Sequence, residues 1–298
     1  MAEIVRVKGV SKSFGRIKAL RNVDLTITRG RVVGLVGPNG AGKTTLIKII
    51  LGILSRDSGY VELNGRDPFK DPEARVGVGV VFERPNLPEA IPVRKLLEQV
   101  AGIHGSSRSD VEWAIEVSGL KGFEWRRFNQ LSAGLKQRAA IAHALVARPN
   151  FVIADEPTSN LDPVERVRIL ELISRLNRDE GVTFLFSSHV LPEVLRVADE
   201  LVIINNGSIT SRGPPEEVIG GFKHARIRSS NPLELARLLS YMGFEARVEG
   251  LNVKVEVDGP PGVSRLFKAL ASMAGEGIVV YGVDLVEPGV EEVLRGAE

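Results

Sequence analysis

Residues 37–45 read GPNGAGKTT, and this stretch decides the fold of the chain. It follows the apolar run RVVGLVG (31–37) and precedes the helical pattern LIKIILGIL (46–54). Strand, glycine-rich loop and helix in this order are the context of a phosphate-binding loop. The glycines allow the backbone to turn tightly and to direct its N–H groups toward phosphate oxygens. We therefore expect this loop to bind the phosphates of a nucleotide.

The side chains of the loop have separate predicted roles. Lys43 places a point charge at the β- and γ-phosphates, and the Thr44 hydroxyl is positioned to ligate Mg²⁺. The positive end of the following helix adds to the attraction for phosphate. The predicted nucleotide contacts of the loop are Gly37, Pro38, Asn39, Gly40, Ala41, Gly42, Lys43, Thr44 and Thr45.

A second apolar strand, within FVIADEP (151–157), ends in two carboxylates. Ligands of open α/β sheets bind at the carboxyl ends of the strands. Adjacent residues of a strand point to opposite sides, so we expect Asp155 and Glu156 to have different roles. Asp155 is the expected Mg²⁺ partner, and Glu156 is the candidate that polarises the water attacking the γ-phosphate. Alone, the pair could equally be an ordinary polar strand end; the phosphate-binding loop favours a catalytic pair.

Composition excludes several classes of protein. The 298 residues include 39 basic and 37 acidic ones, which gives a net charge of +2. The sequence has no dense run of Lys and Arg of the kind that indicates a nucleic-acid-binding protein. The absence of cysteine excludes disulfides, thiol catalysis and cysteine-based zinc sites, and it fits a reducing compartment. The start MAEIVRVKGV reads as a strand, and no run of about 18 apolar residues predicts a membrane span. We expect a soluble protein, whose membrane part, if it has one, is another chain.

The chain is long enough for two domains, and its pattern changes near residue 220. Before that point, β-branched runs alternate with helical patterns, which predicts a parallel-strand α/β core with a helical insert over about 85–150. After RGPPEEVIGG (212–221) the order β-α-β-β-α-β predicts a small ferredoxin-like α+β domain over 221–298. The expected core strands are 31–37, 151–155, 182–189 and 200–207.

The stretch LSAGLKQR (131–138) has the features of a second helix start that faces an anion. Ser132 suits an N-cap, and Gly134 exposes a nearby backbone N–H. The phosphate-binding loop lies far upstream in the sequence, so the sequence gives no reason for one nucleotide to bind at both sites.

Together these residues resemble an ATP-binding-cassette (ABC) ATPase over about residues 1–220. The matching segments occur in the order of that family: the 37–45 loop, LSAGLKQR at the signature position, FVIADEP, SNLD (159–162) and SSH (187–189). The resemblance implies a P-loop NTPase cassette with antiparallel N-terminal strands and a helical subdomain. It also implies that His189 contacts the γ-phosphate, that Asp162 couples two sites, and that Phe14 stacks on adenine. Without the resemblance, Phe14 reads as a core residue and His189 carries no signal.

In the same family, the signature closes over the ATP held by a partner's phosphate-binding loop. The resemblance therefore implies a head-to-tail homodimer, or a pair with a paralogous cassette, around two ATP with Mg²⁺. Ser132 and Gly134 would face the γ-phosphate of the partner's ATP. The predicted catalytic groups are Lys43, Glu156 and His189, and the predicted metal ligands are Thr44, Glu83 and Asp155.

Two segments depart from the commonest family text. The signature is usually Leu-Ser-Gly-Gly-Gln, whereas Ala133 and Leu135 stand at its third and fifth places here. We expect a working, weaker signature. In VVFERPNLP (80–88), Glu83 stands where the family usually has Gln. A carboxylate can still ligate Mg²⁺, so we expect Glu83 to keep the metal role; the alternative is an ordinary loop Glu.

The function favoured by the resemblance is the ATP-hydrolysing subunit of a transporter that drives a separate transmembrane permease from the cytoplasmic face of the membrane. The stretch LVEPGVEEVLRG (285–296) is similar to the tail of a drug- and sodium-exporter-like branch, which favours export. The alternatives are a soluble ABC ATPase not linked to transport and an ATP-gated binding module with negligible turnover. The 221–298 domain could bind a regulator, stabilise the dimer or contact the permease.

Overall fold

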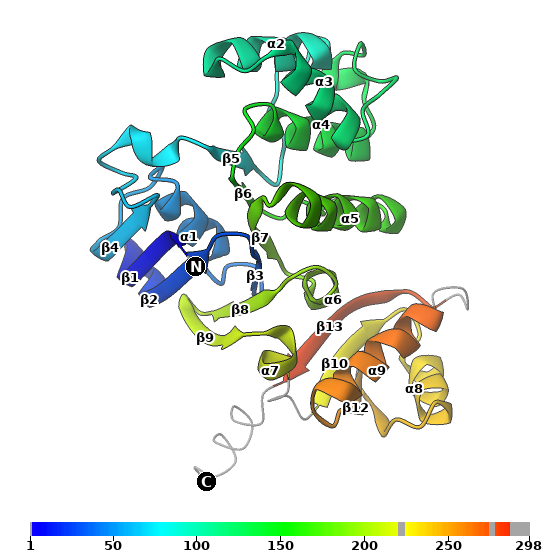
Figure 1. The fold of residues 1–298 in the computed structure, drawn as a ribbon. Helices are drawn as coiled ribbons and strands as arrows, with labels where there is room; N and C mark the ends of the chain where they lie inside the picture. Colours follow the sequence, from blue (N-terminus) through cyan, green and yellow to red (C-terminus); the bar gives the residue numbers. More distant parts are fainter. Residues whose placement is uncertain (1, 220–223, 274–277, 287–298) are drawn as a thin grey trace. The chain divides into compact units, whose positions relative to one another are not determined.

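The computed structural model describes residues 2–219, 224–273 and 278–286. The chain falls into two compact units (Figure 1). The first consists of Met1–His189 and Arg196–Arg212, and the second consists of Val190–Leu195 and Gly213–Glu298. The units therefore divide at Gly213, upstream of the predicted change near residue 220, and one short segment before it belongs to the second unit.

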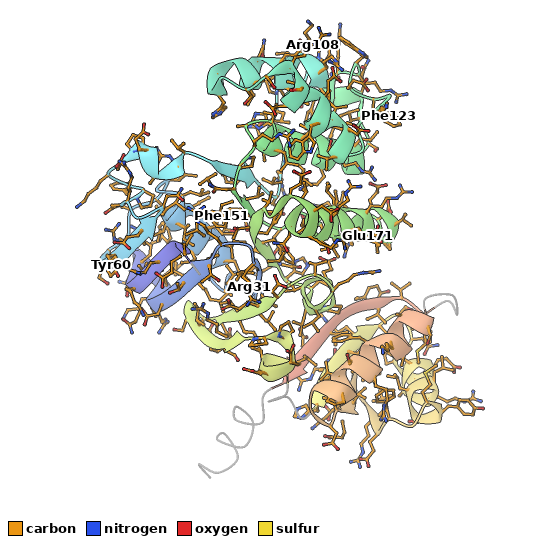
Figure 2. All side chains as sticks on the ribbon, in the orientation of Figure 1. Arg31, Tyr60, Arg108, Phe123, Phe151 and Glu171 are labelled. Atoms are coloured by element: carbon orange, nitrogen blue, oxygen red, sulfur yellow. The ribbon has the colours of Figure 1, made fainter. Side chains whose placement is uncertain are left out.

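The first unit is built on a six-stranded sheet in the order β5-β6-β7-β3-β8-β9. The strands are β5 (Val78–Val81), β6 (Phe151–Ala154), β7 (Thr183–Ser188), β3 (Val32–Val36), β8 (Glu200–Asn205) and β9 (Ser208–Gly213). The pairs from β5 through β8 are parallel. Phe151, labelled in Figure 2, is fully buried, as the apolar run of its strand predicts. The predicted α/β fold with its four core strands is confirmed.

A smaller antiparallel sheet in the order β2-β1-β4 packs beside the first one. It consists of β1 (Glu3–Phe14), β2 (Ile17–Thr28) and β4 (Ser58–Leu63), and helix α1 (Lys43–Ile50) follows β3. A single hydrophobic core contains Val5 of β1, Leu46 of α1 and Leu185 of β7. The antiparallel N-terminal strands are thus confirmed, and they share this core with the phosphate-loop helix.

Helices make up the segment between β5 and β6. They are α2 (Val93–His104), α3 (Arg108–Val117), the 3₁₀ turn η2 (Phe128–Gln130) and α4 (Ala133–Leu145), while the 3₁₀ turn η1 (Pro72–Arg75) precedes β5 and α5 (Pro163–Glu180) follows β6. The first group has its own core, which includes Leu97 of α2, Val111 of α3 and Ala139 of α4. This part of the chain therefore packs as a helical subdomain, as the sequence predicts.

The second unit has the predicted β-α-β-β-α-β order. Its elements are α6 (Leu191–Leu195), α7 (Pro215–Ile219), β10 (His224–Ser229), α8 (Pro232–Tyr241), β11 (Ala246–Glu249), β12 (Asn252–Glu256), α9 (Gly259–Ser272) and β13 (Val280–Val286). The antiparallel sheet runs β11-β12-β10-β13, so the first strand pairs with both the third and the fourth. Most of the 285–296 stretch lies outside the described residues.

Within the described ranges, every helix is too short or too polar to cross a bilayer.

Candidate nucleotide-binding site

The predicted phosphate-binding loop connects β3 to α1, and its glycines are required by close backbone contacts. A Cβ atom at Gly37 would lie 2.2 Å from the Ile204 carbonyl oxygen. Gly42 has a φ of +110°, and its Cβ would lie 2.7 Å from the Ala19 carbonyl oxygen. A side chain at either position would collide with a neighbouring strand, so the tight course of the loop depends on both glycines.

Lys43 is the first residue of α1, and its side chain turns back over the loop. Its Nζ atom donates to the Gly37 carbonyl at 2.7 Å and to the Pro38 carbonyl at 3.2 Å. Nζ also forms an ion pair with Glu156 Oε1 at 3.2 Å. An ammonium has three donors, so these three acceptors use all of them. A phosphate oxygen that binds Lys43 must therefore replace one of these contacts.

The two acidic residues that follow β6 do not continue the strand. The strand ends at Ala154, and Glu156 has a left-handed φ of +49°. The predicted alternation of the two side chains along a strand is therefore wrong. Ser187 of β7 contacts both residues: its Oγ donates to Asp155 Oδ1 at 2.6 Å and accepts from the Glu156 N–H at 2.9 Å. The two carboxylates still have different partners, because Ser187 donates to the carboxylate of Asp155 but contacts Glu156 only through its backbone N–H.

Glu156 bridges two of the predicted catalytic groups. Its Oε1 pairs with Lys43, and its Oε2 lies 2.8 Å from Nδ1 of His189, the residue that follows β7. The Glu156 side chain is 10% exposed and that of His189 is 47% exposed. The carboxylate is thus almost buried and oriented by nitrogen partners on both oxygens, while the histidine ring lies at the surface.

A cavity of about 480 Å³ opens over the loop. Asn39 to Thr45, Glu83 and Glu156 line it, together with residues 16–19, Arg21 and Asn206. Glu83 and Thr44 therefore line the same cavity, and their shared metal role stays a prediction. Asp155 is 3% exposed and lies outside the lining.

Phe14 and Ser187 lie beside the predicted catalytic groups and need separate mention. Phe14, at the end of β1, is 48% exposed, with Lys12 Nζ 5.6 Å from its ring centroid. The lining begins two residues later, at Arg16, so adenine stacking by Phe14 stays a prediction. Ser187 connects both carboxylates, and its signal in the sequence is its place in the SSH segment that ends at the predicted switch histidine.

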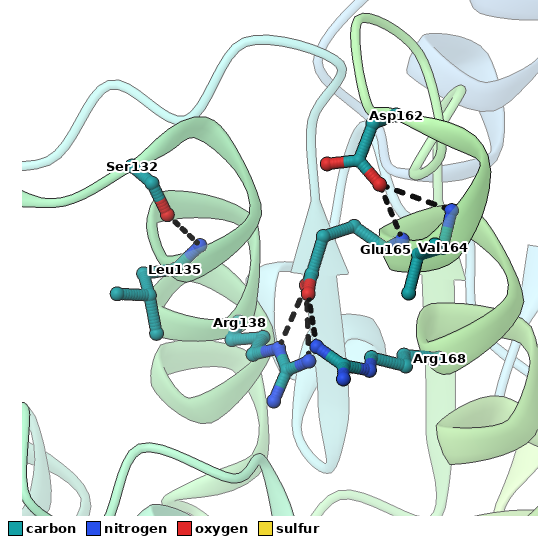
Figure 3. Close-up of polar contacts among 7 residues, drawn as sticks. All are labelled: Ser132, Leu135, Arg138, Asp162, Val164, Glu165 and Arg168. Carbon is teal, nitrogen blue, oxygen red and sulfur yellow. Dashed lines mark hydrogen bonds and ion pairs between the residues drawn. The ribbon is translucent and has the colours of Figure 1, made fainter.

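The predicted second anion site lies elsewhere in the first unit. Ser132 caps α4, with its Oγ accepting from the Leu135 N–H at 3.3 Å (Figure 3). Asp162 caps α5 by accepting from the N–H groups of Val164 and Glu165, each at 3.0 Å. Neither Ser132 nor Gly134 lines the cavity over the phosphate-binding loop.

The donors present fit Mg²⁺, which prefers hydroxyl and carboxylate oxygens and retains water. No group of three or more His, Asp and Glu side chains in the described part of the chain could hold a metal by itself. Thr44, Glu83 and Asp155 therefore suit a metal that takes its remaining ligands from nucleotide phosphates and water.

Comparison with known proteins places this site in a family. The ABC transporter family model matches residues 20–159. The chain is 33% identical to the ABC transporter ATP-binding protein NatA of Bacillus subtilis, over 75% of this chain and 92% of NatA. It is 32% identical to the methionine import ATP-binding protein MetN of Rhizobium johnstonii, over 98% of this chain and 82% of MetN. For the sulfate/thiosulfate import ATP-binding protein CysA of Synechococcus elongatus the identity is 36%, and the match covers 72% of this chain and 63% of CysA.

Solved structures share the fold of the first unit. The structure of cbiO1 of Clostridium perfringens, part of the ABC transporter complex cbiONQ, has a TM-score of 0.66 and 28% identity over 73% of this chain and 91% of its own. The cassette MJ0796, solved as a dimer in a post-hydrolysis state with ADP and Pi, has a TM-score of 0.63 and 27% identity over 70% of this chain and 98% of its own. With the phosphate-binding loop, the acidic pair and the histidine assembled as described, this chain belongs to the ABC transporter family of ATP-binding cassettes.

Proposed function

We propose that the chain binds ATP with Mg²⁺ and hydrolyses it as the nucleotide-binding subunit of an ABC transporter. The observation that carries the proposal is Glu156, which is held between Lys43 and His189 beside the phosphate-binding loop. Buried carboxylates with fixed orientation are suited to general-base catalysis, because they accept a proton in a defined direction. NatA, MetN and the MJ0796 cassette support the assignment by similarity.

The chemistry follows from the two oxygens of Glu156. Of the three acceptors on Lys43, only Glu156 lines the cavity, so a γ-phosphate bound there would replace the contact of Lys43 with Glu156 Oε1. This oxygen would then be free to accept a hydrogen bond from water. Oε2 stays on His189, which keeps the carboxylate oriented. Thr44, Glu83 and Asp155 would hold Mg²⁺, which neutralises charge on the phosphates when it is bound. ATP binding thus converts Glu156 from an ion-pair partner into a base.

The assembly that we propose is a head-to-tail dimer of two copies, or of this chain with a paralogous cassette. In it, Ser132 and Gly134 of one copy would close over the ATP bound to Lys43 and Thr44 of the other. The separate positions of these two anion sites support the proposal, since neither Ser132 nor Gly134 lines the cavity over the loop of its own chain. MJ0796 offers a precedent, because it has been solved as a dimer.

We further propose that the dimer drives a separate transmembrane permease from the cytoplasmic face of the membrane. ATP binding would close the dimer and hydrolysis would open it, which changes the permease conformation by population shift. The names of MetN and CysA state import, whereas the name of NatA states no direction. Our proposal that this chain drives export therefore rests on the similarity of residues 285–296 to the tails of exporter-like relatives. Reconstituting the chain in vesicles with a permease that binds it tests coupling and direction together: cargo should leave the compartment that contains ATP.

The metal role of Glu83 is tested by replacing it with Gln and with Ala. A Gln keeps an oxygen ligand without the charge, whereas Ala removes the ligand. We expect the Mg²⁺ concentration for half-maximal turnover to rise in the order Glu83, Glu83→Gln, Glu83→Ala. Identical Mg²⁺ dependence of all three proteins would show that Glu83 is an ordinary loop residue.

A further inference from the structure

A second groove in the first unit, of about 740 Å³, shares no lining residue with the cavity over the phosphate-binding loop. The end of α3, the middle of α4, one face of α5 and residues 196–197 form its walls. Its charged lining is mainly basic, because five arginines face two glutamates. The charged residues of the lining are Arg138, Arg168, Arg175, Arg178, Arg196, Glu116 and Glu171.

The spacing of residues on α5 explains why the arginines gather on one side. Positions 168, 175 and 178 lie on one helical face, since residues seven and three apart project in similar directions. Glu171, labelled on α5 in Figure 2, is the only acidic lining residue of that helix. Arg196 approaches from a separate segment of the chain, so the positive charge converges on a concave volume from more than one side.

Three of the five arginines have a carboxylate partner, although two of them share one carboxylate. Arg138 and Arg168 both pair with Glu165, at 2.9 Å and 2.6 Å. Arg178 pairs with its neighbour Asp179 at 3.0 Å. These contacts are sufficient to explain the three guanidinium groups as parts of surface ion pairs.

The other two arginines carry the inference. Arg175 Nη2 donates to the Val117 carbonyl at 2.6 Å, and Arg175 has no carboxylate partner among the described residues. Arg196 makes no hydrogen bond or ion pair with any residue that the structure describes. Both side chains are exposed and line the same groove, so a bound anion would contact guanidinium groups without first breaking an ion pair. The pair therefore favours binding of an anion.

The chemistry of the two groups selects the kind of anion. Guanidinium presents paired N–H donors whose geometry matches phosphate oxygens, and its diffuse charge is weakly hydrated. The hydroxyl-bearing Ser174 lies in the same lining, and the volume of the groove is in the range of small-molecule sites. We propose that this groove binds a small soluble molecule carrying a phosphate or polyphosphate group, with Arg175 and Arg196 as its anchors.

The test uses the full chain with its phosphate-binding loop saturated by Mg·ADP, so that the loop cannot take up the probe. Pyrophosphate is titrated calorimetrically in excess Mg²⁺. We expect one pyrophosphate site per chain, and Arg175→Ala or Arg196→Ala should weaken it by about 10-fold or more, the usual effect of losing a charged hydrogen bond. Arg237→Ala, which removes an exposed arginine of α8, is the matched control and should bind like the unmodified chain.

Two further measurements keep the outcomes separate. The affinity for Mg·ADP should be the same in all variants, which shows that they fold and tests the nucleotide site independently of the groove. Vesicles of phosphatidylglycerol replace pyrophosphate in a parallel experiment. The proposal is overturned if pyrophosphate does not bind, or if both arginine variants bind pyrophosphate as tightly as the unmodified chain does. Binding to the vesicles without binding of pyrophosphate would also overturn it.

Discussion

At the scale of single residues, Glu156 is the group on which the proposed chemistry depends. Glu156→Gln keeps the size of the side chain but removes its charge and its capacity as a base. Turnover should fall by about 100-fold or more, the usual contribution of general-base catalysis, while ATP binding persists. Phosphate release and nucleotide affinity are the two measurements. A variant that hydrolyses ATP at close to the original rate would exclude Glu156 as the base.

His143 gives a pH-dependent prediction. Burial in α4, and secondarily the nearby His104, lower the pKa of His143 below its usual value near 6.5. The unfolded chain then binds a proton at His143 more readily than the folded chain does. The contribution of neutral His143 to the free energy of unfolding is therefore complete at pH values above the pKa of His143 in the unfolded chain. It is lost as the pH falls through the folded pKa. Urea unfolding should show a steeper loss of stability from pH 7.5 to 5.5 in the original chain than in His143→Gln. Parallel losses in both proteins would contradict this assignment.

Sequence motifs indicated most of the residues that the structure gathers around the phosphate-binding loop, because local geometry sets their positions. Lys43 and Thr44 belong to one loop whose spacing sets their positions, so they could be assigned without a structure. Ser187 could not be assigned, because its contacts with Asp155 and Glu156 depend on the pairing of β6 with β7. The left-handed φ of Glu156 is likewise a property of the folded strand end and has no signal in the sequence.

At the scale of elements, the contact between α4 and α5 gives Gly134 a structural reason to be glycine. Glu165 of α5 is bound by Arg138 of α4 and by Arg168 of its own helix (Figure 3). A Cβ atom at Gly134 would lie 2.6 Å from Glu165 Oε2. The two arginines restrict the carboxylate, so it cannot move aside without loss of an ion pair.

Gly134→Ala should therefore destabilise the fold by about 1–3 kcal/mol, the range for an added group in a well-packed contact. Glu165→Ala removes the obstacle, so the double variant should recover part of the loss. Urea unfolding of the two single variants and the double variant measures this coupling. Strictly additive effects would show that Glu165 is not what excludes a side chain at position 134.

Elements were easier to predict than their arrangement. Continuous apolar runs indicated β3, β6, β7 and β8 because both faces of a parallel sheet are buried. Nothing in those runs shows that β3 lies between β7 and β8, since strand order depends on crossover connections. Contacts such as Gly134 with Glu165 join separate helices, and no local pattern encodes them.

At the scale of the whole molecule, the division into units affects how the second unit should be tested. Val190–Leu195 belongs to the second unit although it lies within the sequence of the cassette. Deleting the chain after 221 would leave this segment without its partners, so a loss of dimer in such a variant would not assign a role to the second unit. Substitutions on its exposed side chains, such as Tyr241 and Leu251, are the safer probe.

The central claim is that Ser132 acts on the ATP of another copy. The most direct measurement is the molar mass by light scattering of Glu156→Gln with Mg·ATP, because this variant should hold ATP without hydrolysing it. From 32.3 kDa per chain, the account predicts a mass of about twice that value with Mg·ATP. Adding Ser132→Ala to this variant should lower the measured mass toward that of a single chain. Adding Ser107→Ala instead, which removes the equivalent N-cap of α3, should leave the mass of the dimer unchanged. A dimer that persists equally with Ser132→Ala, or forms equally without ATP, would contradict the account.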